Sequence, residues 1–126
     1  MIISGFEFIT PLRVERKTGW SKYLFYTYEP YTVSFRLDGM PTTYTVPAGI
    51  GTDFASIPRF AWRLIDRLGP IVEPAVVHDY MCIIRGPWSS IVAADVFNEG
   101  MRAAGMPDWQ RELAYRAVRY FGPQWE

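Results

Sequence analysis

Residues 73–105 read EPAVVHDYMCIIRGPWSSIVAADVFNEGMRAAG, two apolar runs of helical length on either side of a short break. The apolar residues recur at the spacing of an α-helix, Ser89 or Ser90 is placed to cap the second run, and Gly105 ends it. The break, RGPW, is short enough to fold the two helices back on each other. The stretch therefore predicts an antiparallel helical hairpin at the centre of the fold.

The chain before residue 50 has the residue types and the alternation that are typical of β-strands. The runs GFEFITPLRVER, WSKYLFYTY, YTVSFRL and TTYTVPAG are rich in alternating, β-branched or aromatic residues. Asp38 and Gly39 lie between the last two runs, and an Asp-Gly pair favours a tight hairpin turn. The aromatic residues of WSKYLFYTY fall on both faces of the expected strand. They predict either a sheet covered by helices on one face and by a loop on the other, or an exposed aromatic patch used for oligomerisation or docking.

The chain after residue 50 has a helical period. Ser56 is placed to cap a helix over RFAWRLIDRL, and a last helix is expected from Asp108 to just before Gly122. We therefore expect a single domain of the α+β class. An antiparallel sheet of about four strands lies in residues 1–50, and about four helices, including the central hairpin, lie in residues 51–126.

Composition excludes several classes of function. The 126 residues include 13 basic and 13 acidic ones, so no net charge attracts nucleic acid, and none is expected as a partner. No run is long and apolar enough for a transmembrane segment, and the N-terminal residues do not resemble a signal peptide. One cysteine and one histidine cannot supply a structural zinc site.

The one histidine, His78, has a candidate partner across the hairpin. His78 and Asp95 are equally far in sequence from the centre of the Gly86-Pro87 connection, so they stand at the same height on facing helices. An aspartate that accepts a proton from one imidazole nitrogen orients the ring and leaves the other nitrogen as a base. His78 and Asp95 are therefore candidate catalytic residues. The alternative is a buried hydrogen-bonded pair that only locks the hairpin.

A metal site is the second candidate. Asp79 points about 100° away from His78 around the helix and can flank the same cleft. In the loop VPAGIGTDFASIP, Gly49 and Gly51 can turn carbonyl groups inward and Asp53 adds a carboxylate. Oxygen ligands of this kind bind Ca²⁺ or Mg²⁺, so these four residues are candidate metal ligands. The alternative for Asp53 is a turn or cap before the next helix.

The chain resembles a small phage and prophage family, the domain of unknown function 1353, over roughly Val46 to Gly122. The resemblance is carried by VPAGIGTDFASIPRFAW, AVVHDYMC, ADVFNEGMRAAG and YRAVRYFG, in that order. It implies a phage or prophage origin without an assigned activity. Such an origin implies synthesis in the host cytoplasm and a role in the virion, in lysis or in takeover of the host.

The hairpin is also similar to the cysteine-poor bacterial form of phospholipase A2. That similarity implies that His78 is the base that activates water and that Asp95 orients the ring of His78. It also implies that Asp79 binds Ca²⁺ together with carbonyls from the loop around Gly49 to Asp53. The implied reaction is hydrolysis of an ester in a phospholipid or in the cell envelope. The chain departs from that fold in its less glycine-rich loop and in lacking the disulfides and the secretion signal.

Two hypotheses of function follow. In the first, the protein is a small metal-dependent ester hydrolase with its site at the hairpin. In the second, it is a non-enzymatic phage protein in which His78 and Asp95 are structural. Such a protein is a tail, baseplate or assembly component that binds other virion proteins, or a binder of a host factor, and oligomerisation through the aromatic strands belongs to this hypothesis. A sponge or inhibitor that counters a host defence fits the size of the chain alone.

Overall fold

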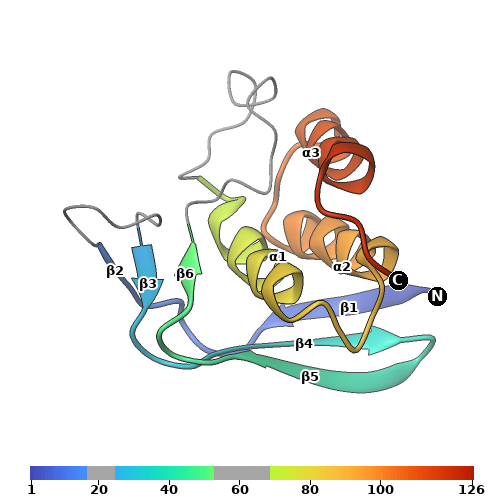
Figure 1. Ribbon diagram of the computed structural model, residues 1–126. Coiled ribbons are helices and arrows are strands. Elements are labelled where there is room, and N and C mark those ends of the chain that lie inside the picture. The colour runs from blue at the N-terminus through green and yellow to red at the C-terminus, as the bar shows by residue number, and fades with distance from the viewer. Residues whose placement is uncertain (17–24, 53–68) are drawn as a thin grey trace. The chain divides into compact units, whose positions relative to one another are not determined.

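The structure is a computed structural model that describes residues 1–16, 25–52 and 69–126 (Figure 1). The chain divides into two units, Met1–Asp53 and Phe54–Glu126. Strands make up the first unit and helices the second, so the α+β class is confirmed. The border between the units lies close to residue 50, where the spacing of the apolar residues changes from that of a strand to that of a helix.

Three strands of the first unit form an antiparallel sheet in the order β1-β4-β5 (Figure 1). These strands are β1 (Ile3–Phe8), β4 (Tyr31–Leu37) and β5 (Met40–Val46). Asp38 and Gly39 join β4 to β5 with φ of 50° and 84°, so the hairpin predicted from the Asp-Gly pair is confirmed. Alternate positions along β4 and β5 carry the buried side chains Tyr31, Val33, Phe35, Tyr44 and Val46.

A second antiparallel sheet has the order β2-β3-β6 and is built from β2 (Val14–Arg16), β3 (Phe25–Thr27) and β6 (Gly51–Thr52). The prediction of one sheet with about four strands is therefore met only roughly, because the described strands form two sheets. Pro11 and Pro30 supply the physical reason. A proline cannot donate to the strand ladder, so each one ends a run and lets the chain pass from one sheet to the other.

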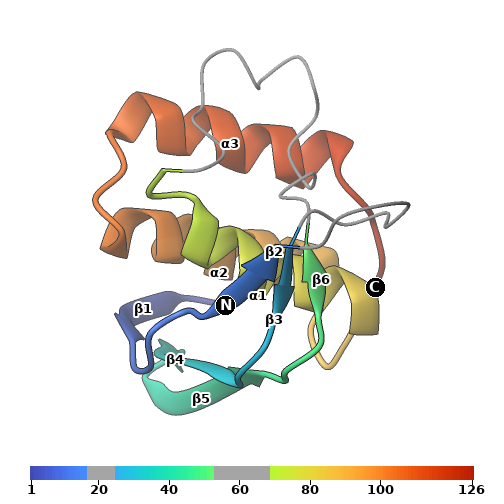
Figure 2. The ribbon, with the colours of Figure 1, turned by 90° about the vertical axis from the view of Figure 1, so that its left-hand side faces the viewer.

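The second unit contains α1 (Val72–Ile84), α2 (Ser90–Ala103) and α3 (Asp108–Phe121). Helix α2 packs against both of the others, and Figure 2 shows α3 running alongside it. The central hairpin is α1 and α2, as predicted. The helix expected over residues 59–68 lies outside the described residues.

Local signals explain where α2 begins and what holds the helices together. The hydroxyl of Ser89 accepts a hydrogen bond from the backbone N–H of Val92 (3.4 Å), which caps the first turn. Burying each large apolar side chain contributes roughly 1.5–3 kcal/mol to stability. The buried apolar side chains of the three helices include Val76, Val77, Met81, Val96, Phe97, Met101 and Val118.

None of the helices in the described ranges has the length and apolarity that a membrane crossing requires.

Candidate functional site

His78 lies in an apolar environment inside the helical unit. It is 2% exposed, and its ring packs on Phe97 of α2 with the ring centroids 5.1 Å apart. The Sγ atom of Cys82, one turn later in α1, lies 3.6 Å from Nδ1 and 3.9 Å from Nε2. Burial lowers the pKa of His78 to about 4, because desolvation penalises the charged imidazolium. The ring is therefore neutral at physiological pH.

Asp95 takes part in a different interaction. One of its carboxylate oxygens accepts a 2.8 Å hydrogen bond from the hydroxyl of Tyr115 in α3. Burial, this hydrogen bond and the charge of Asp95 together raise the pKa of Tyr115 to about 12. In the part of the chain that the structure describes, no hydrogen bond joins Asp95 to His78. The predicted pairing of these two side chains is therefore not formed.

Helical phase accounts for the separation. Asp95 and Phe97 are two positions apart, which is about 200° around α2, so the two side chains leave the helix in nearly opposite directions. Phe97 contacts His78 of α1, and Asp95 contacts Tyr115 of α3. Equal distance from the centre of the connection predicts a shared height along the helices but no shared direction. The apolar stripe of α2, which includes Phe97, is the sequence signal that could have corrected the prediction.

The loop with the predicted carbonyl ligands is folded around Thr27. The hydroxyl of Thr27 donates to the carbonyl of Pro47 (2.9 Å) and accepts from the N–H of Ile50 (3.0 Å). Its backbone accepts from the N–H of Gly49 (2.6 Å) and donates to the carbonyl of Ile50 (3.0 Å). Gly49 has a φ of 87°, which favours glycine, and Gly51 is a residue of β6. Two carbonyls of the loop thus bind Thr27.

The predicted metal ligands belong to both units of the chain. Gly49 and Gly51 belong to the first unit, Asp79 is half-buried in α1 of the second, and Asp53 lies outside the described residues. Across residues 1–16, 25–52 and 69–126, no group of three or more His, Cys, Asp or Glu side chains could hold a metal ion. The metal site stays a prediction.

The aromatic strand predicted to support oligomerisation is described only in part. Residues 20–24 of WSKYLFYTY lie outside the described residues. Phe25 and Tyr26 are half-buried in β3, and Tyr28, just beyond the strand, is exposed. Oligomerisation through this strand stays a prediction.

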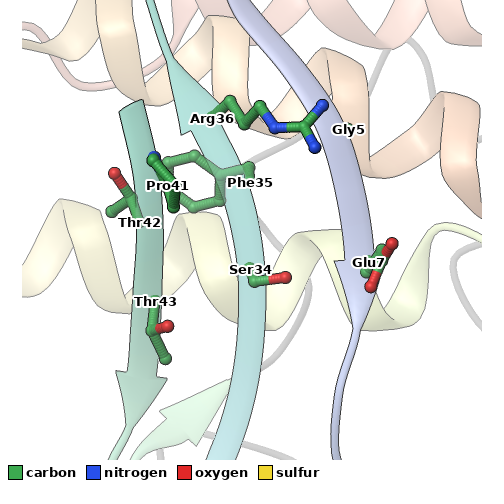
Figure 3. A pocket seen from close by; sticks show the side chains of 8 residues that line it. All are labelled: Gly5, Glu7, Ser34, Phe35, Arg36, Pro41, Thr42 and Thr43. Carbon is green, nitrogen blue, oxygen red and sulfur yellow. The ribbon is translucent and has the colours of Figure 1, made fainter. Parts of the chain in front are cut away.

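An open groove on the first sheet was not found from the sequence (Figure 3). It has a volume of about 250 Å³ and is lined by Gly5, Glu7, Ser34, Phe35, Arg36, Pro41, Thr42 and Thr43. A Cβ on Gly5 would lie 3.5 Å from Nη1 of Arg36, so the guanidinium rests over the glycine. Arg36, Ser34 and Thr43 can donate hydrogen bonds to a polar ligand, and the carboxylate of Glu7 lies in the same groove. The signal for this groove is the alternation of β4, which places Ser34 and Arg36 on one face.

These features define a mixed α+β protein whose histidine is buried and whose described residues form no joined His-Asp pair. A family model described as "Protein of unknown function (DUF1353)" matches residues 29–118. The chain belongs to this family, as its motifs predict. No solved structure gives a significant match.

A curated relative is the "Uncharacterized protein y4jT" of Sinorhizobium fredii (strain NBRC 101917 / NGR234). It is 38% identical to this chain over 87 residues, which cover 65% of this chain and 25% of the relative. The matched region is thus a quarter of that protein's length. Neither the family description nor the relative's name states an activity.

Proposed function

We propose that this protein is a non-enzymatic phage protein, a virion or assembly component or a binder of a host factor, in which His78 and Asp95 are structural. The observation that carries the proposal is the surroundings of His78. Its ring is buried against Phe97 and has no carboxylate partner in the described part of the chain. The phage origin rests on the resemblance of the motifs.

The burial of His78 favours a packing role over a chemical one. A general base acts on a proton within hydrogen-bonding reach, and it works best when its pKa lies near the working pH. The ring of His78 is 2% exposed and its pKa is lowered to about 4, so it is both shielded from water and a weak base. A neutral ring that packs against Phe97 needs no access to solvent and does not need to act as a base.

The partner of Asp95 also favours a structural role. Its hydrogen bond with Tyr115 joins α2 to α3, and Arg111 of α3 donates to the side chain of Asn98 in α2 (3.0 Å). Asp95 and Asn98 are three residues apart and therefore share one face of α2. Together they form a polar seam that fixes how α3 lies on α2.

The competing proposal is a Ca²⁺-dependent or Mg²⁺-dependent ester hydrolase that acts on phospholipid or a cell-envelope ester. It assigns His78 and Asp95 to catalysis and Asp79, Gly49, Gly51 and Asp53 to the metal. The described geometry supports it less, because Asp95 would have to leave Tyr115 and His78 would have to reach solvent.

Two measurements on the purified protein separate the proposals. The first follows hydrolysis of phospholipid vesicles and of a soluble ester with Ca²⁺, with Mg²⁺ and with chelator. The second follows thermal unfolding during titration with each cation, for the wild type and Asp79→Asn. We expect no hydrolysis above the buffer rate and no cation-dependent stabilisation, because a cation bound only by the native state would raise the unfolding temperature. Cation-dependent hydrolysis that is lost in Asp79→Asn would overturn the proposed function.

A further inference from the structure

The two edges of the β1-β4-β5 sheet differ in how well they are protected against pairing with another strand. In β1 the register shifts between Ser4 and Glu7, Gly5 has a φ of 60°, and Glu7 adds a charge. Strand β5 keeps an unbroken register with β4 along its whole length, and its sequence MPTTYTV holds no charged residue. Bulges, charges and prolines are the usual protection of an edge, so β1 is protected by its bulge and charge, whereas β5 is protected only at Pro41 and is open beyond it.

The pairing of β4 shows which backbone groups of β5 face outward. The carbonyl of Thr32 accepts from the N–H groups of Ile9 and Thr10 (3.0 and 3.2 Å), so the backbone of Thr32 points away from β5. Its opposite residue Thr45 therefore points its own backbone away from β4, since opposite residues form hydrogen-bonded and non-hydrogen-bonded pairs in turn. The 3.0 Å contact between the hydroxyls of Thr32 and Thr45 fits a closely spaced, non-hydrogen-bonded pair.

Thr43 is two positions from Thr45 and shares its direction. Both residues are exposed, and no backbone hydrogen bond outside the sheet ladders binds either of them within the described ranges. Their N–H and C=O groups are therefore open to a further strand. Pro41 and Pro47, which lack an N–H, bound this open stretch at either end.

We propose that β5 pairs in antiparallel fashion with β5 of a second copy of this chain, so that two three-stranded sheets become one continuous sheet. The inference deepens the proposed function, on which it rests, by naming the surface through which such a protein assembles. Around a two-fold axis β5 of one copy faces β5 of the other, so charges on this edge would face like charges. The uncharged β5 avoids this repulsion, and opposed threonines favour pairing.

The unequal edges also predict a closed assembly. Pairing of β5 with β5 uses the open edge of this sheet in both copies, so the continuous six-stranded sheet ends at a β1 strand on each side. Because β1 carries the bulge and Glu7, it does not continue the sheet. We therefore expect a dimer rather than a fibre.

The test is the oligomeric state, measured by sedimentation velocity and light scattering. The wild type is expected to be a dimer at micromolar concentrations. Thr43→Lys combined with Thr45→Lys, and Thr43→Glu combined with Thr45→Glu, are each expected to be monomeric because like charges then face each other. An equal mixture of the two double variants is expected to recover the dimer. The matched control, Ile2→Lys combined with Ile9→Lys, changes exposed residues on the β1 side and is expected to stay dimeric.

Amide hydrogen exchange provides a measurement that needs no variant. The Thr43 and Thr45 amides are expected to be protected in concentrated wild type and to lose protection on dilution. A monomeric wild type, charged double variants that still dimerise, or a mixture that does not recover the dimer would each overturn the inference. The hydrolysis assay on the same protein separates this from the proposed function, because a monomer without hydrolysis overturns only the inference. A dimer with cation-dependent hydrolysis overturns the proposed function.

Discussion

Helix α2 meets its two neighbours through seams of opposite character. Toward α1 it presents Phe97, which packs on the neutral ring of His78. Toward α3 it presents Asp95 and Asn98, which accept hydrogen bonds from Tyr115 and Arg111. The apolar seam stabilises through buried volume, and the polar seam aligns two helices through directed bonds. The aspartate that lies level with the histidine along the hairpin therefore binds the other neighbouring helix, α3.

The apolar seam should be broken most strongly by Phe97→Ala. Removing a buried phenylalanine leaves a cavity and costs about 3–5 kcal/mol of unfolding free energy. Urea denaturation followed by circular dichroism measures the loss. The exposed Phe121→Ala is the matched control and should change stability by less than about 0.5 kcal/mol. A loss below about 1 kcal/mol for Phe97→Ala would contradict the packing described for His78.

His78→Ala should follow, with a loss of about 2–3 kcal/mol from the cavity beside Phe97. His78→Leu keeps most of the volume and needs no charge or hydrogen bond, so it should lose less than the alanine variant. The same urea experiment ranks the two variants. Equal losses would mean that the ring nitrogens, rather than the volume of the side chain, stabilise the seam.

Acid should weaken the apolar seam about as much as His78→Ala does. The pKa of His78 is lowered to about 4 in the folded protein from an ordinary value of 6.5, so the unfolded chain binds more protons between these two values. The contribution of the neutral ring to stability is therefore complete above pH 6.5 and is lost as the pH falls toward 4. Unfolding temperatures measured across this range should fall more for the wild type than for His78→Leu. Parallel curves for the two proteins would disprove a buried, neutral His78.

The polar seam should give the smallest effect. Tyr115→Phe removes the hydrogen bond to the half-buried Asp95 and should cost about 1 kcal/mol. Tyr120→Phe is the control, because Tyr120 is 65% exposed. A double-mutant cycle with Asp95→Asn isolates the coupling between Asp95 and Tyr115. A coupling energy near zero would mean that apolar packing alone, and not this hydrogen bond, aligns α3 on α2.

Local signals predicted much of the helical unit and less of the sheets. The expected hairpin and last helix correspond to α1, α2 and α3, with Ser89 as the cap of α2. The Asp38-Gly39 turn also lies where its residue types favour it. The division of the strands between two sheets was not predicted, because strand pairing joins residues far apart in sequence and no local pattern records the partner.

The amino-acid sequence by itself determined the α+β class, the helical hairpin and the family, since helical period, caps and motifs act over a few residues. Only the tertiary structure decided the partners of His78 and Asp95. Their equal distance from the hairpin connection was visible in the sequence, but direction around α2 depends on where both neighbouring helices lie. The same holds for the open edge of β5, which exists because β4 has β1 as its other neighbour.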